Sequence, residues 1–438
     1  MSIDPKKVRK ILSKNILADG FDLIMDLEKS KGSYIVDHAT GDSYLDMFSM
    51  YASASIGYNH PNILKNKKLL TSVSLIKPTL SDLYNIHYAD FVDTFNRLAI
   101  PKYLPHAFFV EGGALAVENA LKVAFDWKVR KNLQKGIKNR GTQIIHYKQA
   151  FHGRSGYTLS LTNTTDPRKT MYYPKFNWPR ISNPYIKFPL SKQELSMLKK
   201  KEKESIVEIN DAIKNNPHDI AAIIIEPIQG EGGDNFFRDE YFVNLREICN
   251  KNDMLLIFDE VQTGIGITGK MWAYQHYSIQ PDIICFAKKA QVGGILVSKR
   301  IDEVKNNVFV ESSRINSTFG GNLVDMVRFK IILNTIKEEK LLSNSKKVGS
   351  YLLSNLIELQ KTYPAYVTNS RGLGLFAAFD LPSMTERDEL WEKMIKNKLL
   401  ILPSGDRSIR FRPHLTTTKK EIDLAIDIID ISIKKCLR

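Results

Sequence analysis

The sequence predicts an α/β protein that combines a large domain, built on a mainly parallel sheet, with a smaller α+β domain. Between about residues 80 and 330, short apolar runs alternate with helical segments, as in a sheet covered by helices on both faces. After residue 330, long helical stretches are mixed with strands, which is typical of an α+β arrangement. The 438 residues, 43% of them apolar, are enough for more than one domain and a sizeable core.

The N-terminal region is expected to begin with an amphipathic helix around residues 5–15. Two alternating runs, 32–37 and 43–48, flank a turn that contains Gly41, and this pattern predicts a β-hairpin. Residues 51–61 follow neither a helical nor a strand periodicity, so we expect a loop there.

The remaining elements follow from apolar runs of strand length and from helical periodicity. The strands expected in the large domain are 107–110, 143–147, 220–225, 254–258, 283–286 and 295–298. The C-terminal region is expected to form helices at 340–363 and 385–398, strands at 374–380 and 399–403, and a last helix from Lys419.

The formal net charge of +15 is of the kind seen in nucleic-acid-binding proteins, but the basic residues are dispersed along the chain. The densest basic run, 198–204, mixes both signs as a solvated helix face does. A positive field could favour anionic substrates, and a lysine-rich genome bias would give the same count. We therefore expect no nucleic-acid partner.

Composition also predicts the compartment and argues against metal binding. No run of about 18 apolar residues is present, and the N-terminus lacks the apolar segment of a signal peptide, so we expect a cytoplasmic protein without a membrane partner. The cysteines Cys249, Cys285 and Cys436 are odd in number and far apart, which indicates neither a disulfide framework nor a zinc site. No metal site is expected.

Two predicted strands bring opposite charges to one edge of the sheet. The apolar run that begins at Leu255 ends in Asp259, and the segment 281–288 is expected to form a second strand that ends in Lys288 instead of an acid. A buried carboxylate is costly unless a cationic partner meets it, and ligands of open α/β sheets bind at this edge. A lysine can form a Schiff base with an aldehyde cofactor, while a carboxylate keeps a pyridine nitrogen protonated. This pair is the minimum that pyridoxal phosphate requires.

On these residues the chain resembles the class III aminotransferases of fold type I, and within them most closely the L-lysine 6-aminotransferases. The resemblance extends from about Asp19 to Leu415. It implies a large pyridoxal-phosphate-binding domain at 80–330 and a small domain formed by the N-terminal segment 1–79 together with 331–438. It also implies that the cofactor is pyridoxal 5′-phosphate, held by Lys288.

The resemblance implies further contacts to this cofactor. Gly113 and Ala114, at the start of a helix, match the phosphate loop, where the family commonly has a hydroxyl residue. The other matches are Phe151 stacked on the ring, Val261 under its opposite face, Glu226 near the ring, Gln262 at the phenolic oxygen and Asp259 at the ring nitrogen. Thr318 matches a residue that reaches the phosphate of the neighbouring subunit, so the resemblance implies a homodimer with shared sites.

The substrate residues implied by the resemblance are two arginines, a glutamate and an asparagine. Arg154 matches the arginine that binds the substrate carboxylate far from the reacting amine, and Arg410 matches the α-carboxylate binder. Glu231 matches the residue that covers this second arginine when an ω-amino substrate enters, although a plain solvated loop glutamate is the alternative. Asn316 matches a substrate contact in the lysine enzymes, and residues 51–61 either border the substrate or merely connect elements.

These matches imply a ping-pong transaminase in which Lys288 acts as general base and acid. The expected reaction moves the ε-amino group of L-lysine to 2-oxoglutarate and yields 2-aminoadipate 6-semialdehyde and L-glutamate. Aminotransferases for 4-aminobutyrate or ornithine are the nearest alternatives, followed by a decarboxylase or aminomutase on the same fold. A nucleic-acid-binding protein would leave Asp259, Lys288 and Arg410 as coincidences.

Overall fold

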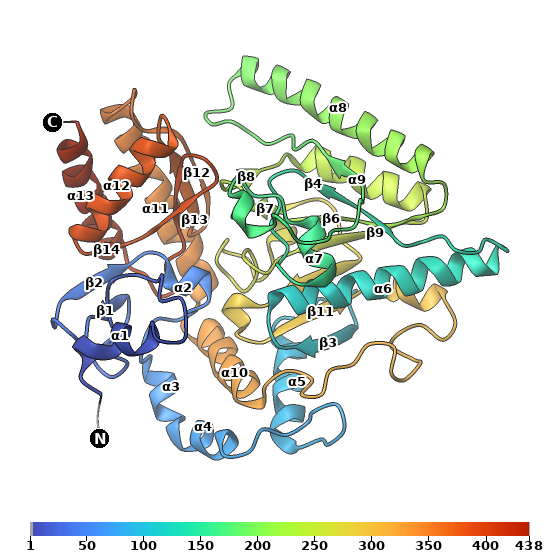
Figure 1. Cartoon of the computed structure of the whole chain (residues 1–438), viewed down its shortest axis with the longest axis horizontal. Helices are drawn as coiled ribbons and strands as arrows, with labels where there is room; N and C mark the ends of the chain where they lie inside the picture. The colour runs from blue at the N-terminus through green and yellow to red at the C-terminus, as the bar shows by residue number, and fades with distance from the viewer. Residues whose placement is uncertain (1–2, 438) are drawn as a thin grey trace.

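The computed structural model describes residues 3–437 and has a large part around a seven-stranded sheet and a smaller part formed by both ends of the chain (Figure 1). The blue N-terminal and red C-terminal segments lie side by side, because β2 (Ser43–Asp46) pairs in parallel with β14 (Leu399–Leu400). On its other side β2 pairs with β1 (Tyr34–Val36), which is the predicted hairpin. The domain boundaries after residues 79 and 330 stay predictions.

The central sheet has the order β3-β11-β10-β9-β6-β4-β5. The strand bounds are His106–Val110 (β3), Gly293–Val297 (β11), Ile283–Phe286 (β10), Leu255–Asp259 (β9), Ile220–Ile225 (β6), Gln143–Tyr147 (β4) and Arg180–Ile181 (β5). Neighbouring strands from β10 to β5 are parallel, whereas β11 is antiparallel to β10 and β3. The expected mainly parallel sheet is confirmed. The antiparallel pair arises because the connection 287–292 is too short for the crossover that a parallel pair needs.

Helices cover both faces of this sheet, and alternate strand residues point to different faces. Ile224 and Ile257 pack with α6 (Gly113–Gln134) in one apolar cluster. Their neighbours Ile223 and Leu256 belong to another cluster, with α9 (Asp239–Lys251). Because every residue of β6 and β9 is buried, β6 and the part of β9 before Asp259 are continuous apolar runs in the sequence.

The remaining helices belong to three parts of the chain. In the large part they are α5 (Ile86–Leu98), α7 (Gly156–Leu161), α8 (Lys192–Asn215) and α10 (Leu323–Glu338). The N-terminal region adds α1 (Val8–Leu12), α2 (Ser49–Ala52), α3 (Pro61–Lys65) and α4 (Lys67–Ser74). The smaller part adds α11 (Leu341–Thr362), α12 (Met384–Lys396) and α13 (Lys419–Cys436).

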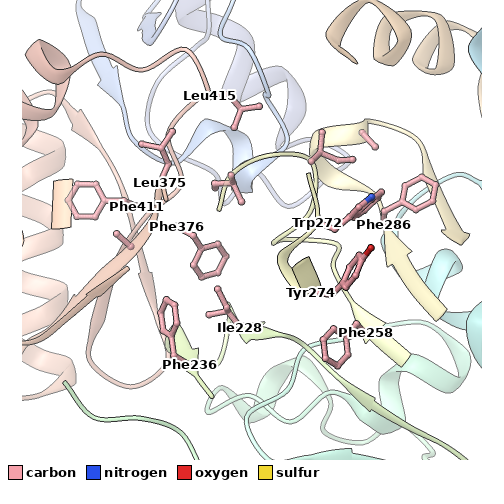
Figure 2. Packing of buried hydrophobic residues seen from close by; sticks show 14 of the residues in the cluster. Ile228, Phe236, Phe258, Trp272, Tyr274, Phe286, Leu375, Phe376, Phe411 and Leu415 are labelled. Atoms are coloured by element: carbon pink, nitrogen blue, oxygen red, sulfur yellow. The ribbon is translucent and has the colours of Figure 1, made fainter. Parts of the chain in front are cut away.

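The smaller part contains a four-stranded sheet of order β12-β13-β16-β15, and a short hairpin of the large part packs against it. The strand bounds are Thr368–Leu373 (β12), Phe376–Asp380 (β13), Ser408–Phe411 (β16) and Leu402–Ser404 (β15), and those of the hairpin are Ile228–Gln229 (β7) and Asn235–Phe236 (β8). Figure 2 shows Ile228 and Phe236 of the hairpin close to Phe376 of the sheet. The same apolar cluster continues to Phe258 and Phe286 of the central sheet, so a shared core holds the two parts together.

Several expected boundaries differ from the structure. The first helix is shorter, with a 3₁₀ turn at Pro5–Lys7 before α1. The expected strand 399–403 is divided at Ile401, because its first half pairs with β2 and its second half with β16. Within residues 3–437, no helix has the length and apolar character needed to cross a membrane. The same residues contain no group of three or more His, Cys, Asp or Glu placed to hold a metal ion.

Candidate active site

A cavity of about 880 Å³ opens at the carboxyl edge of the central sheet. Strands β3, β4, β6, β9 and β10 all end at it, which is where ligands of open α/β sheets bind. The predicted site residues that line the cavity are Gly113, Ala114, Phe151, Arg154, Glu226, Asp259, Val261, Gln262 and Lys288. Residues 53–59 also line it, so the N-terminal loop contributes to the cavity wall.

Lys288 lines the cavity, whereas the neighbouring Lys289 points into the protein. Burial is the main cause that lowers the pKa of Lys288 to about 8, and the charge of Arg410 lowers it further. The expected extension of the second strand to Lys288 is wrong. Strand β10 ends at Phe286, and both lysines lie in a 3₁₀ turn, Lys288–Ala290.

Lys289 supports an unusual turn on the cavity wall. Four successive residues, Ser49 to Ala52, have φ values from 42° to 68°, which non-glycine residues rarely adopt together. Lys289 Nζ donates to the Ala52 carbonyl at 3.0 Å, and Asp46 Oδ1 accepts the backbone N–H of Ser49 at 2.8 Å. The second lysine therefore stabilises the wall while the first remains free for chemistry.

Asp259, the last residue of β9, is oriented by a histidine. Its Oδ2 accepts a hydrogen bond from His152 Nδ1 at 2.7 Å, and its Oδ1 accepts the Val261 N–H at 3.0 Å. The His152 side chain is fully buried, and its Nε2 has no partner among the described residues. His152 is not among the site residues predicted from the sequence, and the structure gives it a direct contact to the site carboxylate. The only sequence signal was its place beside Phe151, after a strand that ends at the same edge.

Glu226 joins two loops of the site. Its two carboxylate oxygens accept the backbone N–H groups of Phe151 and Gly230, each at 3.0 Å. Burial raises the pKa of Glu226 to about 7, and the nearby charge of Asp259 also raises it. Glu226 therefore fixes the backbone that carries the predicted stacking aromatic.

The start of α6 has the form of an anion cradle. Gly112 has φ 89°, and a Cβ atom on Gly113 would lie 2.9 Å from Cγ1 of Val261. The first residues of this 22-residue helix line the cavity, so the positive end of the helix dipole lies beside it. The start of α6 can bind a phosphate, Lys288 can bind an aldehyde, and Asp259 can pair with a ring nitrogen. The residues present therefore fit pyridoxal phosphate.

Glu231 connects two cationic side chains outside the lining of the cavity. Its Oε2 accepts from Arg410 Nη2 at 2.8 Å, and its Oε1 accepts from Lys169 Nζ at 2.6 Å. Burial alone would raise the pKa of Glu231, but Arg410 and Lys169 together outweigh it and lower the pKa to about 2. The pairing with Arg410 was expected from the resemblance, and the contact with Lys169 was not.

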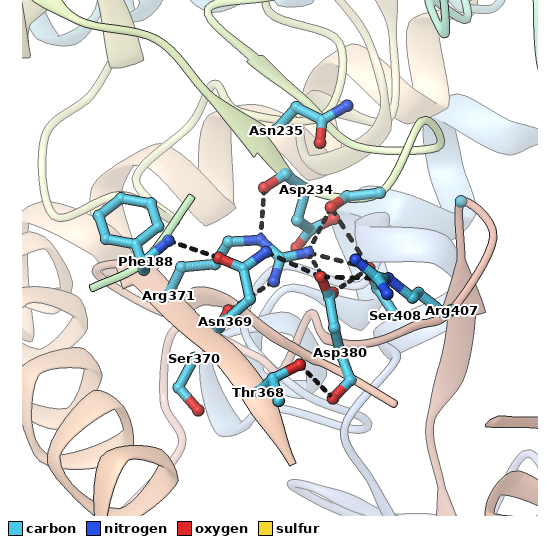
Figure 3. A network of polar contacts seen from close by, with 12 residues as sticks. Phe188, Asp234, Asn235, Thr368, Asn369, Ser370, Arg371, Asp380, Arg407 and Ser408 are labelled. Carbon is cyan, nitrogen blue, oxygen red and sulfur yellow. Dashed lines mark hydrogen bonds and ion pairs between the residues drawn. The ribbon is translucent and has the colours of Figure 1, made fainter. Parts of the chain in front are cut away.

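The loop that carries Glu231, residues 230–234, is held from the smaller part of the molecule. Figure 3 shows Arg371 at the centre of this network, where it forms an ion pair with Asp380 at 2.8 Å. Arg371 also donates to the carbonyl oxygens of Gly233 and of Asp234, the latter at 2.8 Å. The Asp234 side chain forms a fully buried ion pair with Arg412.

Arg412 also orients a predicted cofactor contact, because its Nε donates to Oε1 of Gln262 at 3.1 Å. Asn316 and Thr318, in contrast, are exposed and do not line the cavity of their own chain. The Asn316 side chain accepts the N–H of Ser317 at 2.7 Å. The structure therefore brings together the predicted residues of the sheet edge and leaves these two outside.

Comparison with known proteins gives consistent matches. The model of the family "Aminotransferase class-III" matches residues 17–433. An L-lysine-epsilon aminotransferase from Mycobacterium tuberculosis is 49% identical over 96% of this chain and 94% of its own, and one from Amycolatopsis lactamdurans is 45% identical over 98% and 96%. The solved structure of a lysine aminotransferase from M. tuberculosis in the internal aldimine form has a TM-score of 0.96 and 48% identity over 99% of each chain.

Proposed function

Because the chain belongs to the class III aminotransferases, we propose that it moves the ε-amino group of L-lysine to 2-oxoglutarate. The products are 2-aminoadipate 6-semialdehyde and L-glutamate. The observation that carries this proposal is the Glu231–Arg410 pair, together with the effect of both charges on the pKa of Lys288. When a carboxylate is paired with this arginine, the site suits the uncharged carbon chain of an ω-amino donor. When that carboxylate moves away, the same arginine can bind the α-carboxylate of a substrate. The identity to L-lysine-epsilon aminotransferases supports lysine as the donor.

The cofactor is pyridoxal 5′-phosphate, which withdraws electrons from the substrate carbon when it is bound. We assign the phosphate to the N–H groups of Gly113 and Ala114 at the start of α6, and the ring nitrogen to Asp259. The contact with His152 holds the Asp259 carboxylate in one orientation. Phe151 and Val261 would enclose the ring, with Glu226 and Gln262 at its edge.

Lys288 is assigned to hold the cofactor aldehyde and to move the proton of the reacting carbon. With a pKa of about 8, its amine has a neutral fraction near neutral pH that an ordinary lysine lacks. Nζ then takes the proton from the ε-carbon of the donor as general base. Arg154, exposed at the cavity, is assigned to the carboxylate at the far end of the substrate.

The proposed assembly is a homodimer with shared sites. Asn316 and Thr318 are exposed outside the cavity of their own chain, which is the arrangement expected if they serve the site of a partner. We assign Thr318 to the partner's cofactor phosphate and Asn316 to the partner's substrate. Sedimentation of the purified protein gives the assembly directly, and a monomer with full activity would contradict the assignment.

A panel of amine donors with 2-oxoglutarate tests the proposed reaction. L-lysine should give the fastest formation of glutamate, with a carbonyl product that cyclises and is identified by mass. Ornithine and 4-aminobutyrate are the comparison donors, because each also places an ω-amine at Lys288 when its carboxylate binds Arg154. Faster turnover of 4-aminobutyrate would make the lysine assignment wrong and would leave the cofactor and the family unaffected.

A further inference from the structure

Lys169 is a second cation on Glu231, and no role in the proposed reaction has been assigned to it. It ends a 3₁₀ turn, Pro167–Lys169, in the surface segment between α7 and β5. Its amine lies 2.6 Å from Oε1 of Glu231 and forms no other ion pair within the described residues. Both side chains are partly buried, with 20% of Lys169 and 23% of Glu231 exposed. The contact is therefore better shielded than an ordinary surface pair.

We propose that Lys169 is a positioning residue that retains Glu231 when a dicarboxylate takes its place on Arg410. This inference rests on the proposed function and concerns its second half-reaction, in which 2-oxoglutarate or glutamate binds. Lys169 thereby sets how readily the site accepts a five-carbon dicarboxylate. It acts through Glu231 and touches neither the cofactor nor the reacting atoms.

The two carboxylate oxygens of Glu231 have different partners. Oε2 is bound to Arg410 and Oε1 to Lys169, so the bond to Arg410 can break while the bond to Lys169 remains. Without Lys169, a carboxylate that leaves Arg410 would be an unpaired charge in a partly buried place, which is costly. With Lys169, the displaced carboxylate keeps a cationic partner.

Arg410 is built to accept a second carboxylate before Glu231 leaves. The residue is 3% exposed, and its Nε and Nη1 atoms have no hydrogen-bond partner among the described residues. A guanidinium has five N–H donors, and Glu231 is bonded through Nη2 alone. An incoming α-carboxylate can therefore form its first hydrogen bonds to Arg410 and then displace Glu231 toward Lys169. The flexible four-carbon stem of Lys169 permits it to follow this movement.

Lys169→Met removes the charge and keeps the length of the side chain. Glu231 is then bonded to Arg410 alone, so the covered state is favoured and a dicarboxylate binds less well. Glutarate, an unreactive five-carbon dicarboxylate, should bind about three- to tenfold more weakly, the value of one partly shielded ion pair. The KM for 2-oxoglutarate should rise by a similar factor. The rate of the isolated half-reaction with L-lysine should change less than about twofold, because Glu231 stays on Arg410 in it.

The experiment uses the purified enzyme with its cofactor and measures glutarate binding by titration calorimetry. Stopped-flow absorbance gives the two half-reactions separately. Lys169→Arg keeps the charge and should restore most of the glutarate affinity, which a merely structural role would not require. Lys175→Met is the matched control, since Lys175 is an exposed lysine of the same segment whose amine, among residues 3–437, is hydrogen-bonded to the Thr170 carbonyl alone.

Unchanged or tighter glutarate binding in Lys169→Met would overturn the proposal, because Lys169 would then be a bystander or would hold Glu231 on Arg410. An equal loss in both half-reactions, without rescue by arginine, would also overturn it. Failure of the proposed function is seen separately in the unmodified enzyme, as no reaction with L-lysine. Weaker glutarate binding in Lys169→Met would still support the role of Lys169 in that case, because glutarate binding needs no amine donor.

Discussion

The lowered pKa of Lys288 predicts how the cofactor-free protein captures pyridoxal phosphate as pH changes. Burial lowers the pKa of this amine from 10.5 to about 8, and only the neutral amine attacks an aldehyde. The rate of capture should therefore rise about tenfold per pH unit below 8 and level off above it. An ordinary lysine would show the same rise up to a pH near 10.5.

The size of the effect follows from the two pKa values. At pH 7 about 9% of an amine with a pKa of 8 is neutral, against about 0.03% for a pKa of 10.5, which is a ratio near 300. Glu231 is among the charges that raise the pKa of Lys288, so Glu231→Ala should move the midpoint to lower pH. The direction of this second shift depends only on the sign of the charge that is removed.

Stopped-flow absorbance of the cofactor-free protein mixed with pyridoxal phosphate, between pH 6 and 10, measures this midpoint. A simple alkylamine studied in parallel corrects for the titration of the aldehyde itself, and Lys288→Ala shows the contribution of other lysines. A rate that still rises tenfold between pH 9 and 10 would refute the reasoning, because Lys288 would then titrate as an exposed lysine.

Four further predictions concern single residues. Borohydride reduction of the enzyme followed by peptide mapping should place the pyridoxyl group on Lys288, and an adduct on Lys289 would contradict the assignment. Asp259→Asn should keep the cofactor but lose several decades of turnover, at about 1.4 kcal/mol for each factor of ten, and near-normal turnover would exclude Asp259 as the ring partner. Glu231→Ala should slow the half-reaction with lysine more than that with glutamate in stopped-flow measurements, because Arg410 is then uncovered; equal losses would argue against this role. Asn316→Ala should reduce the rate with L-lysine by about ten- to a hundredfold and leave 4-aminobutyrate nearly unchanged, since a hydrogen bond to the α-ammonium is lost.

The site residues at the carboxyl edge of the central sheet could be predicted because the sequence pattern that marks them is local. A fully buried strand in an α/β sheet is a continuous apolar run, so the charged residue that ends it, such as Asp259, is conspicuous in the sequence. The placement of Lys288 in the cavity was predicted for the same reason. Its local geometry was not, because the sequence does not show that the chain leaves strand β10 through a 3₁₀ turn, Lys288–Ala290, that contains both lysines.

Contacts between distant loops had no comparable signal. His152 and Asp259 are 107 residues apart: His152 follows strand β4, Asp259 ends strand β9, and β6 separates these strands in the sheet. Lys169 and Glu231 are 62 residues apart, and both lie in irregular segments whose paths depend on the whole fold. Histidine and lysine are common in such segments, so neither residue could be distinguished from a structural or solvated one. The resemblance supplied the Glu231–Arg410 pair, whereas these two contacts required the structure.

The network around residues 230–234 indicates which part of the site moves when Glu231 leaves Arg410. Arg371 binds the carbonyl oxygens of Gly233 and Asp234, the Asp234 carboxylate is paired with Arg412, and the Glu231 carbonyl accepts the N–H of Gly405. Displacing this backbone would break several buried hydrogen bonds at about 1 kcal/mol each or more, besides exposing a buried ion pair. A rotation of the Glu231 side chain breaks only its contact with Arg410. We therefore expect the change between the two half-reactions to be a side-chain movement of Glu231 on a fixed loop, during which Lys169 remains its partner.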